Sequence, residues 1–363
     1  MANKIERYII EKSNSFFKNR YERYFLKELR GIESKSEVPI IELTLQQKKE
    51  IQEYYASKGF TGIKTDWHQY IYSTTQRWSP KMVPDNFYHL ILERIYNDKG
   101  INGWEDKAYM SMFLPDVLFP TTLIANINGY YLNEQRQIVS IDEAKSIVLA
   151  EGRAFAKPSL QSGGGRNAML VTEANIDEVF KMLNKNYVVQ RIIKQHKETA
   201  AFNPSSVNTE KILSFLYKGE VFILSAHMRV GAPDSFTDNA SGGKGYTFGI
   251  KPDGSIEPIA MNVFGKKRDT DYFGNSLSGR TLSYHKDICE IIKKAHKRLP
   301  YFGFVSWDFC VTEKGEPLLI EYNTSNAEVL VYQMTSGPLF GDMLDDVLAD
   351  ARKHSNLIKY TRF

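Results

Sequence analysis

Apolar and aromatic side chains recur at helical spacing among charged residues in the N-terminal part of the chain. They are Ile5, Ile9, Phe16, Phe17, Tyr21, Tyr24, Phe25 and Leu29. A second apolar run, Leu45 to Tyr55, follows Thr44, whose hydroxyl can cap a helix that ends before Gly59. This periodicity predicts a mostly helical N-terminal region, which we place at residues 1–103.

The pattern changes near residue 106 to short β-type runs separated by glycine-rich turns and a few helices. The expected strands cover 154–158, 168–172, 187–193, 211–217, 220–229, 304–312 and 317–323. Amphipathic spacing predicts helices over 176–183, 285–299 and 345–352. Runs of strands mixed with a few helices are typical of an α+β fold.

Composition and charge exclude several classes of protein. The chain has 363 residues, of which 42% are hydrophobic and 25% charged, as in ordinary globular proteins. Its net charge of +4 is too small to indicate a nucleic-acid partner. Cys289 and Cys310 fit neither a metal motif nor a disulfide framework, and we see neither a signal peptide nor an apolar run of ~20 residues. We therefore expect a cytoplasmic protein.

The basic, aromatic-rich first helix admits two interpretations. Its aromatic side chains could enter the interface of an anionic membrane while Lys and Arg meet the headgroups. We favour a face packed on the rest of the protein, because acidic residues interrupt the basic surface at Glu6, Glu11, Glu22 and Glu28. A homodimer also remains open.

A lysine followed by a glycine-rich turn is the clearest candidate for binding phosphate. The segment Phe155 to Pro158 delivers Lys157, and the turn after it contains Gly163, Gly164 and Gly165. Glycines let backbone N–H groups converge on an anion, and the lysine adds a positive charge. The spacing matches neither a P-loop nor GxGxxG, so the alternative of a flexible hairpin stays open at this point.

Two carboxylates and an amide come together near the C-terminus. Glu321 and Asn323 lie two residues apart on one predicted strand, so their side chains share a face. A hairpin through Lys314 and Gly315 brings Asp308 alongside them. These hard oxygen donors, set between apolar runs, are the ligands that Mg²⁺ prefers. The alternative is a surface hairpin whose acidic side chains are solvated.

A third group of candidates lies between these two segments. Arg229, at the end of a predicted strand, offers planar recognition of a carboxylate or phosphoryl oxygen. Asn208 precedes the strand before it, and Asn239 lies in a loop that continues to Gly242 and Gly243. We include Asn208 and Asn239 among the candidate nucleotide contacts.

The order of these features resembles the ATP-grasp superfamily and, within it, the sugar-transfer-associated branch, over about Trp104 to Glu328. The motifs that carry the resemblance are Val83-Pro84-Asp85, Glu105-Asp106-Lys107, Lys157 with the three glycines, Val188 to Ile193, Ser206 to Thr209, Asp238-Asn239 with Gly242-Gly243, Asp308-Phe309 and Glu321-Tyr322-Asn323. This chain departs from the usual pattern in having Lys211 for an arginine, Gln190 for a glutamate, and a helical N-terminal region in place of an α/β domain.

The resemblance implies a fold in which two α+β lobes hold ATP between them. It implies a first lobe at 104–187, a second at 188–345 and a C-terminal helix with a basic tail at 346–363. Lys107, Lys157 and the glycine loop would hold the phosphates. Gln190, Arg191 and Ile192 would lie at the adenine, where backbone groups of the last two read the base, and Asp308, Glu321 and Asn323 would hold Mg²⁺.

The activity implied by the resemblance is ATP-dependent joining of a carboxylate to an amine through an acyl phosphate. Arg229 and Lys157 would be the catalytic residues, and the acid would be a small or sugar-linked carboxylate used in surface-polysaccharide biosynthesis. Two alternatives remain open: a kinase that phosphorylates a hydroxyl with the same Mg-ATP site, and a non-catalytic nucleotide-binding protein.

Overall fold

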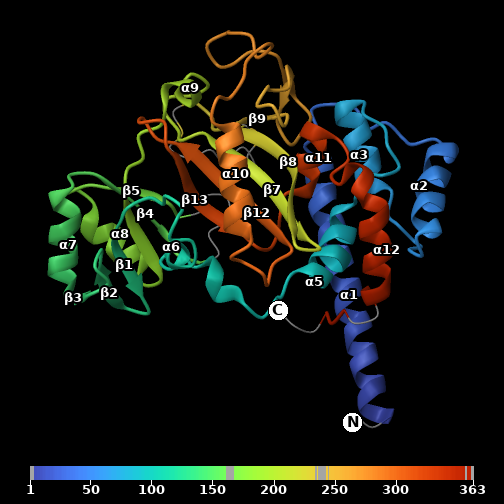
Figure 1. Ribbon diagram of the computed structural model, residues 1–363, viewed down its shortest axis with the longest axis horizontal. Coiled ribbons are helices and arrows are strands. Elements are labelled where there is room, and N and C mark those ends of the chain that lie inside the picture. Colours follow the sequence, from blue (N-terminus) through green and yellow to red (C-terminus); the bar gives the residue numbers. More distant parts are fainter. Residues whose placement is uncertain are drawn as a thin grey trace.

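Two antiparallel sheets form two lobes, and the N-terminal helices cover the larger lobe (Figure 1). The computed structural model describes residues 4–160, 167–233, 235, 243, 245–355 and 358–360. The sheets and the helical N-terminal region confirm the expected α+β class. Within the described part of the chain, no helix is both long and apolar enough to cross a bilayer.

The first lobe is a six-stranded sheet with strand order β3-β2-β1-β6-β4-β5. Its strands are β1 (Thr122–Ile127), β2 (Tyr130–Asn133), β3 (Ile138–Val139), β4 (Ala154–Pro158), β5 (Met169–Val171) and β6 (Tyr187–Arg191). Helices α7 (Ile141–Ala150) and α8 (Ile176–Leu183) pack on it through Ala144, Val148, Val179 and Phe180. Asn128 and Gly129 supply the positive φ angles of the β1–β2 turn.

The second lobe is a seven-stranded sheet with strand order β11-β10-β9-β8-β7-β12-β13. Its strands are β7 (Thr209–Tyr217), β8 (Glu220–Val230), β9 (Tyr246–Gly249), β10 (Ala260–Met261), β11 (Lys267–Arg268), β12 (Phe304–Val311) and β13 (Pro317–Asn323). The accompanying helices are α9 (Lys197–Ala200), α10 (His285–His296), α11 (Val329–Ser336), η5 (Gly341–Met343) and α12 (Leu344–His354).

Strand β12 is buried on both faces, which explains why six of its eight residues are apolar. Val305, Trp307 and Phe309 point into the core that contains helix α10, whereas Phe304 points into the core that contains the N-terminal helices and α12. Because side chains alternate along a strand, Asp308 shares the face of Phe304. The sheet thus places the candidate metal ligand on the side of the N-terminal region and α11.

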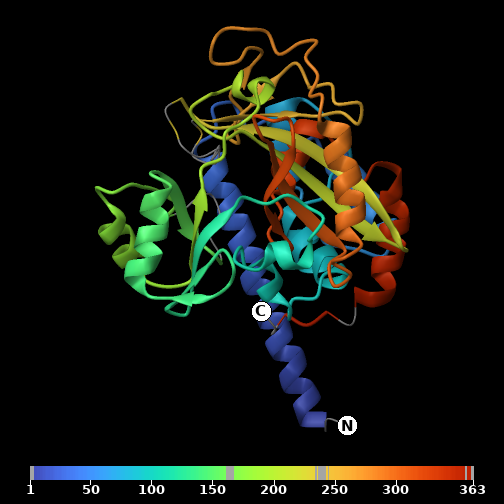
Figure 2. The ribbon, with the colours of Figure 1, turned by 60° about the vertical axis from the view of Figure 1, so that its left-hand side comes forward.

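The N-terminal region packs on that second face and on α11. Its helical segments are α1 (Lys4–Glu33), α2 (Leu45–Ser57), α3 (Asp66–Thr75), α4 (Asp85–Phe87), the π-helix η1 (Tyr88–Leu92), α5 (Glu93–Tyr96), η2 (Asn102–Glu105) and α6 (Met110–Phe113). Thr44 forms the predicted cap of α2, in a capping box with Gln47. Leu29 of α1 is buried against α3 and α11, while the N-terminal part of α1 projects from the body (Figures 1 and 2).

One predicted boundary is wrong. We placed the start of the second lobe at residue 188, but β6 lies in the first sheet, where it pairs with β1 and β4. The apolar run Tyr187 to Val189 is buried between two neighbouring strands of that sheet, so the first lobe extends to Arg191. The C-terminal helix also begins earlier than 346, at Leu344.

Candidate functional site

The β12–β13 hairpin places Asp308 and Glu321 directly opposite each other. Residues that pair across an antiparallel ladder project to the same face, so the two carboxylates point to one side of the sheet. Asn323 pairs with Ser306, one step further along that face. Asp308 and Glu321 line a cavity beside the sheet, whereas Asn323 is not part of its lining.

Each carboxylate forms an ion pair with a buried lysine. Lys107 Nζ lies 3.0 Å from Glu321 Oε2, and Lys211 Nζ lies 2.9 Å from Asp308 Oδ1. Lys211 reaches Asp308 because β7 pairs with β12 at that position. The sequence indicated Lys211 only as a departure from the family pattern, and the pairing that gives it a partner depends on the register between strands far apart in the chain.

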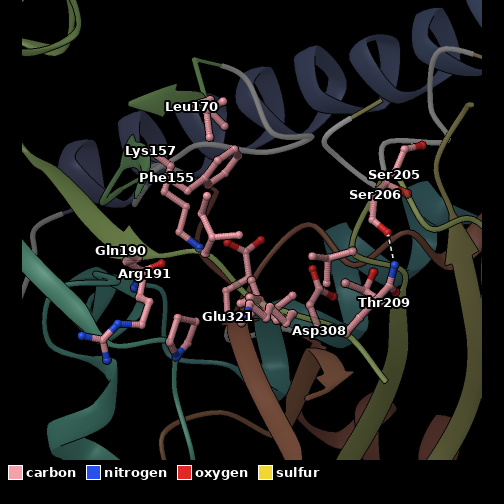
Figure 3. Close-up of a pocket in the computed structure, with 18 of the residues that line it drawn as sticks. Phe155, Lys157, Leu170, Gln190, Arg191, Ser205, Ser206, Thr209, Asp308 and Glu321 are labelled. Atoms are coloured by element: carbon pink, nitrogen blue, oxygen red, sulfur yellow. Dashed lines mark hydrogen bonds between the residues drawn. The ribbon is translucent and has the colours of Figure 1, made fainter. Parts of the chain in front are cut away.

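Lys157 extends from β4 of the first lobe toward Glu321 of the second lobe (Figure 3). Burial lowers the pKa of Lys157 to about 8, and the nearby Lys107 acts in the same direction against the attraction of Glu321. Burial alone would raise the pKa of Glu321, but Lys107 and Lys157 hold it at about 2. Two lysines from separate segments therefore converge on one ionised carboxylate.

These residues suit a divalent cation with vacant coordination positions. In the described parts of the chain, no three or more His, Cys, Asp or Glu residues are grouped so that they could hold a metal by themselves, so the two carboxylates would share the ion with other ligands. Two carboxylates with a neighbouring amide match the way proteins hold Mg²⁺, which keeps water and phosphate oxygens in its remaining positions. The residues present fit the expected ion.

A cavity of about 510 Å³ lies between the lobes and is lined by Lys157, Arg229, Asp308 and Glu321. Gln190, Arg191 and Ile192, at the end of β6, line it as well. Lys107 lines an adjoining cavity. The predicted residues Gly163, Gly164, Gly165 and Asn239 lie outside the described part of the chain.

The strand end expected to meet the adenine is only partly open to a ligand. The Arg191 backbone N–H donates to the carbonyl of Thr121, and the Arg191 side chain forms two hydrogen bonds with Glu151, at 2.8 and 3.0 Å. The Gln190 side chain donates to Thr122 Oγ1 at 3.1 Å. The sheet therefore engages the Arg191 N–H, and reading of the base by backbone groups of Arg191 and Ile192 stays a prediction.

Two apolar side chains that the sequence analysis did not single out complete the upper wall. Phe155 and Leu170, on the paired strands β4 and β5, line the cavity above Gln190 (Figure 3). The sequence places Phe155 and Lys157 on one face of β4, since they are two residues apart, but it does not show that Leu170 lies opposite Phe155. An aromatic and an aliphatic side chain suit one face of a planar base.

Asn208 is not among the residues that line the cavity, although Val207 and Thr209 on either side of it are. It is fully buried, and its side-chain amide donates to the carbonyl oxygens of Thr199 and Asn203 and to Gln195 Oε1. These bonds hold the loop that leads into β7. The Asn208 amide group, which we predicted to contact the nucleotide, is thus already engaged in hydrogen bonds within the protein.

Arg229 is buried in the centre of the second sheet, 7% exposed, between Thr209 of β7 and Thr247 of β9. It lines the cavity between the lobes and also a second cavity on the side of α1 and α11. Its charge lowers the pKa of Glu328, at the start of α11, to about 2 although burial would raise it. The guanidinium therefore stands where the two cavities meet.

Comparisons with solved structures return ATP-grasp proteins at low similarity. An N5-carboxyaminoimidazole ribonucleotide synthetase solved with ADP is 10% identical, with a TM-score of 0.39 over 62% of this chain and 46% of that one. D-alanyl-alanine synthetase A from Vibrio cholerae is 16% identical, with a TM-score of 0.40 over 70% and 65%. The ATP-grasp ligase PsnB, solved with a minimal precursor, Mg and ADP, is 11% identical, with a TM-score of 0.42 over 71% and 62%.

This chain thus spans less than two thirds of each of these three proteins. No curated protein matches its sequence. The family described as sugar-transfer associated ATP-grasp matches residues 160–347, which is more than half of the chain and includes Arg229, Asp308 and Glu321. The chain belongs to the sugar-transfer associated ATP-grasp family.

Proposed function

We propose that this protein is an ATP-dependent ligase that joins a carboxylate to an amine through an acyl phosphate. The observation that carries the proposal is the position of Arg229, which lines both the cavity between the lobes and the second cavity. A buried guanidinium at this junction can hold a substrate carboxylate with bidentate hydrogen bonds beside the terminal phosphate. The family description links the family to sugar transfer, and we propose a sugar acid used in surface-polysaccharide biosynthesis as the substrate.

ATP would lie in the cavity between the lobes. Phe155 and Leu170 would cover the base at the end of β6, and Lys157 and Lys107 would meet the phosphates, the latter by leaving Glu321. Asp308 and Glu321, with Asn323 beside them, would hold Mg²⁺, which neutralises charge on the phosphates when bound. Lys211 would keep Asp308 ionised and correctly oriented.

The protein's own part in the reaction is placement and charge stabilisation. Arg229 would orient the acid so that a carboxylate oxygen faces the terminal phosphorus, and the buried lysines would stabilise negative charge in surroundings of low dielectric. Transfer gives an acyl phosphate and ADP. Attack by an amine at the acyl carbon then forms the amide and releases phosphate.

The test is a hydroxamate screen. Purified protein is incubated with ATP, Mg²⁺ and hydroxylamine together with panels of uronic acids, amino acids and dicarboxylic acids, and both ADP and hydroxamate are measured. A ligase gives acid-dependent hydroxamate in step with ADP, because hydroxylamine traps acyl phosphates. Release of ADP with a stable phosphorylated product and no hydroxamate would instead establish the kinase reaction.

A matched pair of variants locates the carboxylate. We expect Arg229→Gln to lower hydroxamate formation by about 10²-fold, the usual order for losing one stabilising donor, with little change in ATP affinity. Arg298→Gln, at an exposed arginine two residues after the end of α10 whose side chain donates to the Phe113 carbonyl, should leave the rate unchanged. Equal rates in the two variants would remove Arg229 from the proposal.

A further inference from the structure

A second cavity of about 610 Å³ lies between the C-terminal part of α1, the start of α11 and strands β8 and β9. Its deep part includes Arg229 and Thr247, which are 7% and 6% exposed. Exposed residues of α1 and the segment after it, Lys27, Glu28 and Lys35, stand at its mouth. The N-terminal helix thus forms a wall of a cavity that reaches the sheet.

Besides Glu28 at the mouth, two carboxylates, Asp85 and Glu328, line this cavity, and their surroundings differ. Glu328 lies near Arg229, Lys211 and His227, and the first two charges hold it ionised. Asp85, at the first position of α4, has a carboxyl oxygen, Oδ1, that is buried and has no hydrogen-bond partner among the described residues. Asp85 is therefore the carboxylate in this cavity whose charge the protein leaves poorly compensated.

The groups around Asp85 do not supply the missing cation. Burial raises its pKa to about 6, Glu328 acts in the same direction, and the nearby His89 and a backbone hydrogen bond with Leu330 offset this only in part. His89 Nδ1 faces Glu93 at 3.4 Å, and Lys35 Nζ lies 5.9 Å from the centre of the Phe264 ring. A buried carboxylate oxygen without a partner is costly unless a ligand satisfies it.

The second cavity also shares Arg229 with the cavity between the lobes, where we propose that the acid is activated. Because Arg229 lines both cavities, a carboxylate held by Arg229 would present its carbon to the second cavity after activation. Apolar side chains cover the remaining walls, among them Ile32, Val263 and Phe264. This combination favours a ligand with a cationic group and a partly apolar body.

We propose that the second cavity binds the amine co-substrate, a primary amine whose nitrogen lies at Asp85 between Arg229 and the wall formed by α1. This assignment rests on the proposed ligase function. Asp85 then acts as a catalytic residue that both attracts the ammonium and accepts its proton.

The step balances as follows. The ammonium group transfers one proton to the Asp85 carboxylate, and its lone pair attacks the acyl carbon. The new C–N bond forms, the bond between the acyl carbon and the phosphate oxygen breaks, and phosphate leaves with that electron pair. The second proton of the nitrogen goes to the departing phosphate, and Asp85 later releases its proton to water.

Binding is tested without any knowledge of the acid. The full chain is loaded with Mg²⁺ and a non-hydrolysable ATP analogue, and saturation-transfer NMR is recorded with ethanolamine, L-alanine, glucosamine and, as an anionic comparison, glucuronate. We expect signals from at least one of the three amines, reduced at least fivefold in Asp85→Asn. Asp66→Asn, the same change at the first residue of α3 and outside the described cavities, should bind as the parent does. Equal amine signals in parent and Asp85→Asn, or signals from glucuronate alone, would overturn the assignment.

A second variant protects the test against misfolding of Asp85→Asn. Gly31 of α1 lines the cavity, and a Cβ built there would meet no atom within 4 Å. Gly31→Trp should therefore fold normally and block the mouth, with amine signals reduced at least fivefold. Asn19→Trp, on an exposed part of the same helix, should have no effect. Full amine binding by Gly31→Trp would contradict the proposal.

Catalysis separates this inference from the ligase proposal. With an acid found by the hydroxamate screen, Asp85→Asn should lose amide formation with the binding amine by at least tenfold. It should retain hydroxamate formation within about threefold, because hydroxylamine is neutral near pH 7.5 and needs no base. Amine binding at Asp85 without hydroxamate from any acid would end the ligase proposal alone, whereas hydroxamate with equal amide rates in the two proteins would end the amine-site proposal alone.

Discussion

Replacement of Lys211 by Met tests the electrostatic account of the metal hairpin. The ion pair between Lys211 and Asp308 is 2.9 Å long, and the two side chains are 7% and 8% exposed. At that distance and an effective dielectric constant of about 20, the attraction is about 6 kcal/mol, most of which offsets the cost of removing both charges from water. Removing only the lysine leaves a buried carboxylate, for which a loss of about 3–5 kcal/mol in unfolding free energy is expected.

The loss in unfolding free energy should lie at the lower end of this range, because Lys157 also lies close enough to Asp308 to stabilise its charge. We therefore expect Lys211→Met to lose about 3 kcal/mol. The double variant Lys211→Met/Asp308→Asn removes both charges. Its loss should be at least about 1 kcal/mol smaller than the sum of the two single losses, and this difference is the coupling that a double-mutant cycle isolates.

The assay is urea unfolding followed by tryptophan fluorescence, in EDTA to exclude metal. All four tryptophans, Trp67, Trp78, Trp104 and Trp307, lie outside the first sheet, so their signal follows the second lobe and the helices packed on it. A loss below about 1 kcal/mol for Lys211→Met, or a double variant as unstable as the sum of the single ones, would refute the reasoning.

Three further outcomes follow from the same contacts. Glu321→Gln should lower ATP turnover by about 10²-fold and, because it takes away the ion-pair partner of Lys107, should also lower the thermal midpoint. Turnover at the parent rate would remove Glu321 from the metal site. The pKa of Lys157 is about 8 in the folded chain and 10.5 in the unfolded chain, so the folded chain binds fewer protons between these pH values. The unfolding free energy of the parent should therefore rise from pH 8 to 10 relative to that of Lys157→Met, by at most about 1.4 kcal/mol per pH unit. Parallel pH profiles of the two proteins would contradict this. Asn97→Ala should lower the unfolding free energy measured by chemical denaturation by about 3 kcal/mol, because the Asn97 side chain donates to the carbonyls of Phe304 and Thr324 and accepts from the Phe304 N–H. Asn19→Ala, at an exposed position of α1, is the control, and equal stability of the two variants would contradict this role of Asn97.

Long apolar runs made most of the second sheet predictable. β12 and β13 are rich in hydrophobic residues and are joined by a clear turn at Lys314 and Gly315, and their pairing put Asp308 opposite Glu321 as the sequence suggested. Strands β1, β2 and β3 of the first sheet and β9, β10 and β11 of the second were not predicted. Of these, β3, β10 and β11 have two residues each, too few to show alternation. The strand at 187–191 was found but assigned to the wrong lobe, since strand neighbours are not encoded in a local pattern.

The same limit applies to the site. Lys157 was predictable because a strand delivers it into a glycine-rich turn. Lys211, Asp85 and Glu328 come together with the other site residues only through the register of β7 against β12 and the packing of the N-terminal region on α11. No spacing along the chain indicates such contacts.

The central claim, that the cavity between the two sheets is a Mg-ATP site, is tested most directly by calorimetric titration. Titration of ATP in the presence of Mg²⁺ should give saturable binding of one nucleotide per chain, weakened at least tenfold in Lys157→Met and unchanged in Lys185→Met, at a surface lysine beside β6. Flat heats for the parent protein, or equal affinities for the parent and Lys157→Met, would contradict the account.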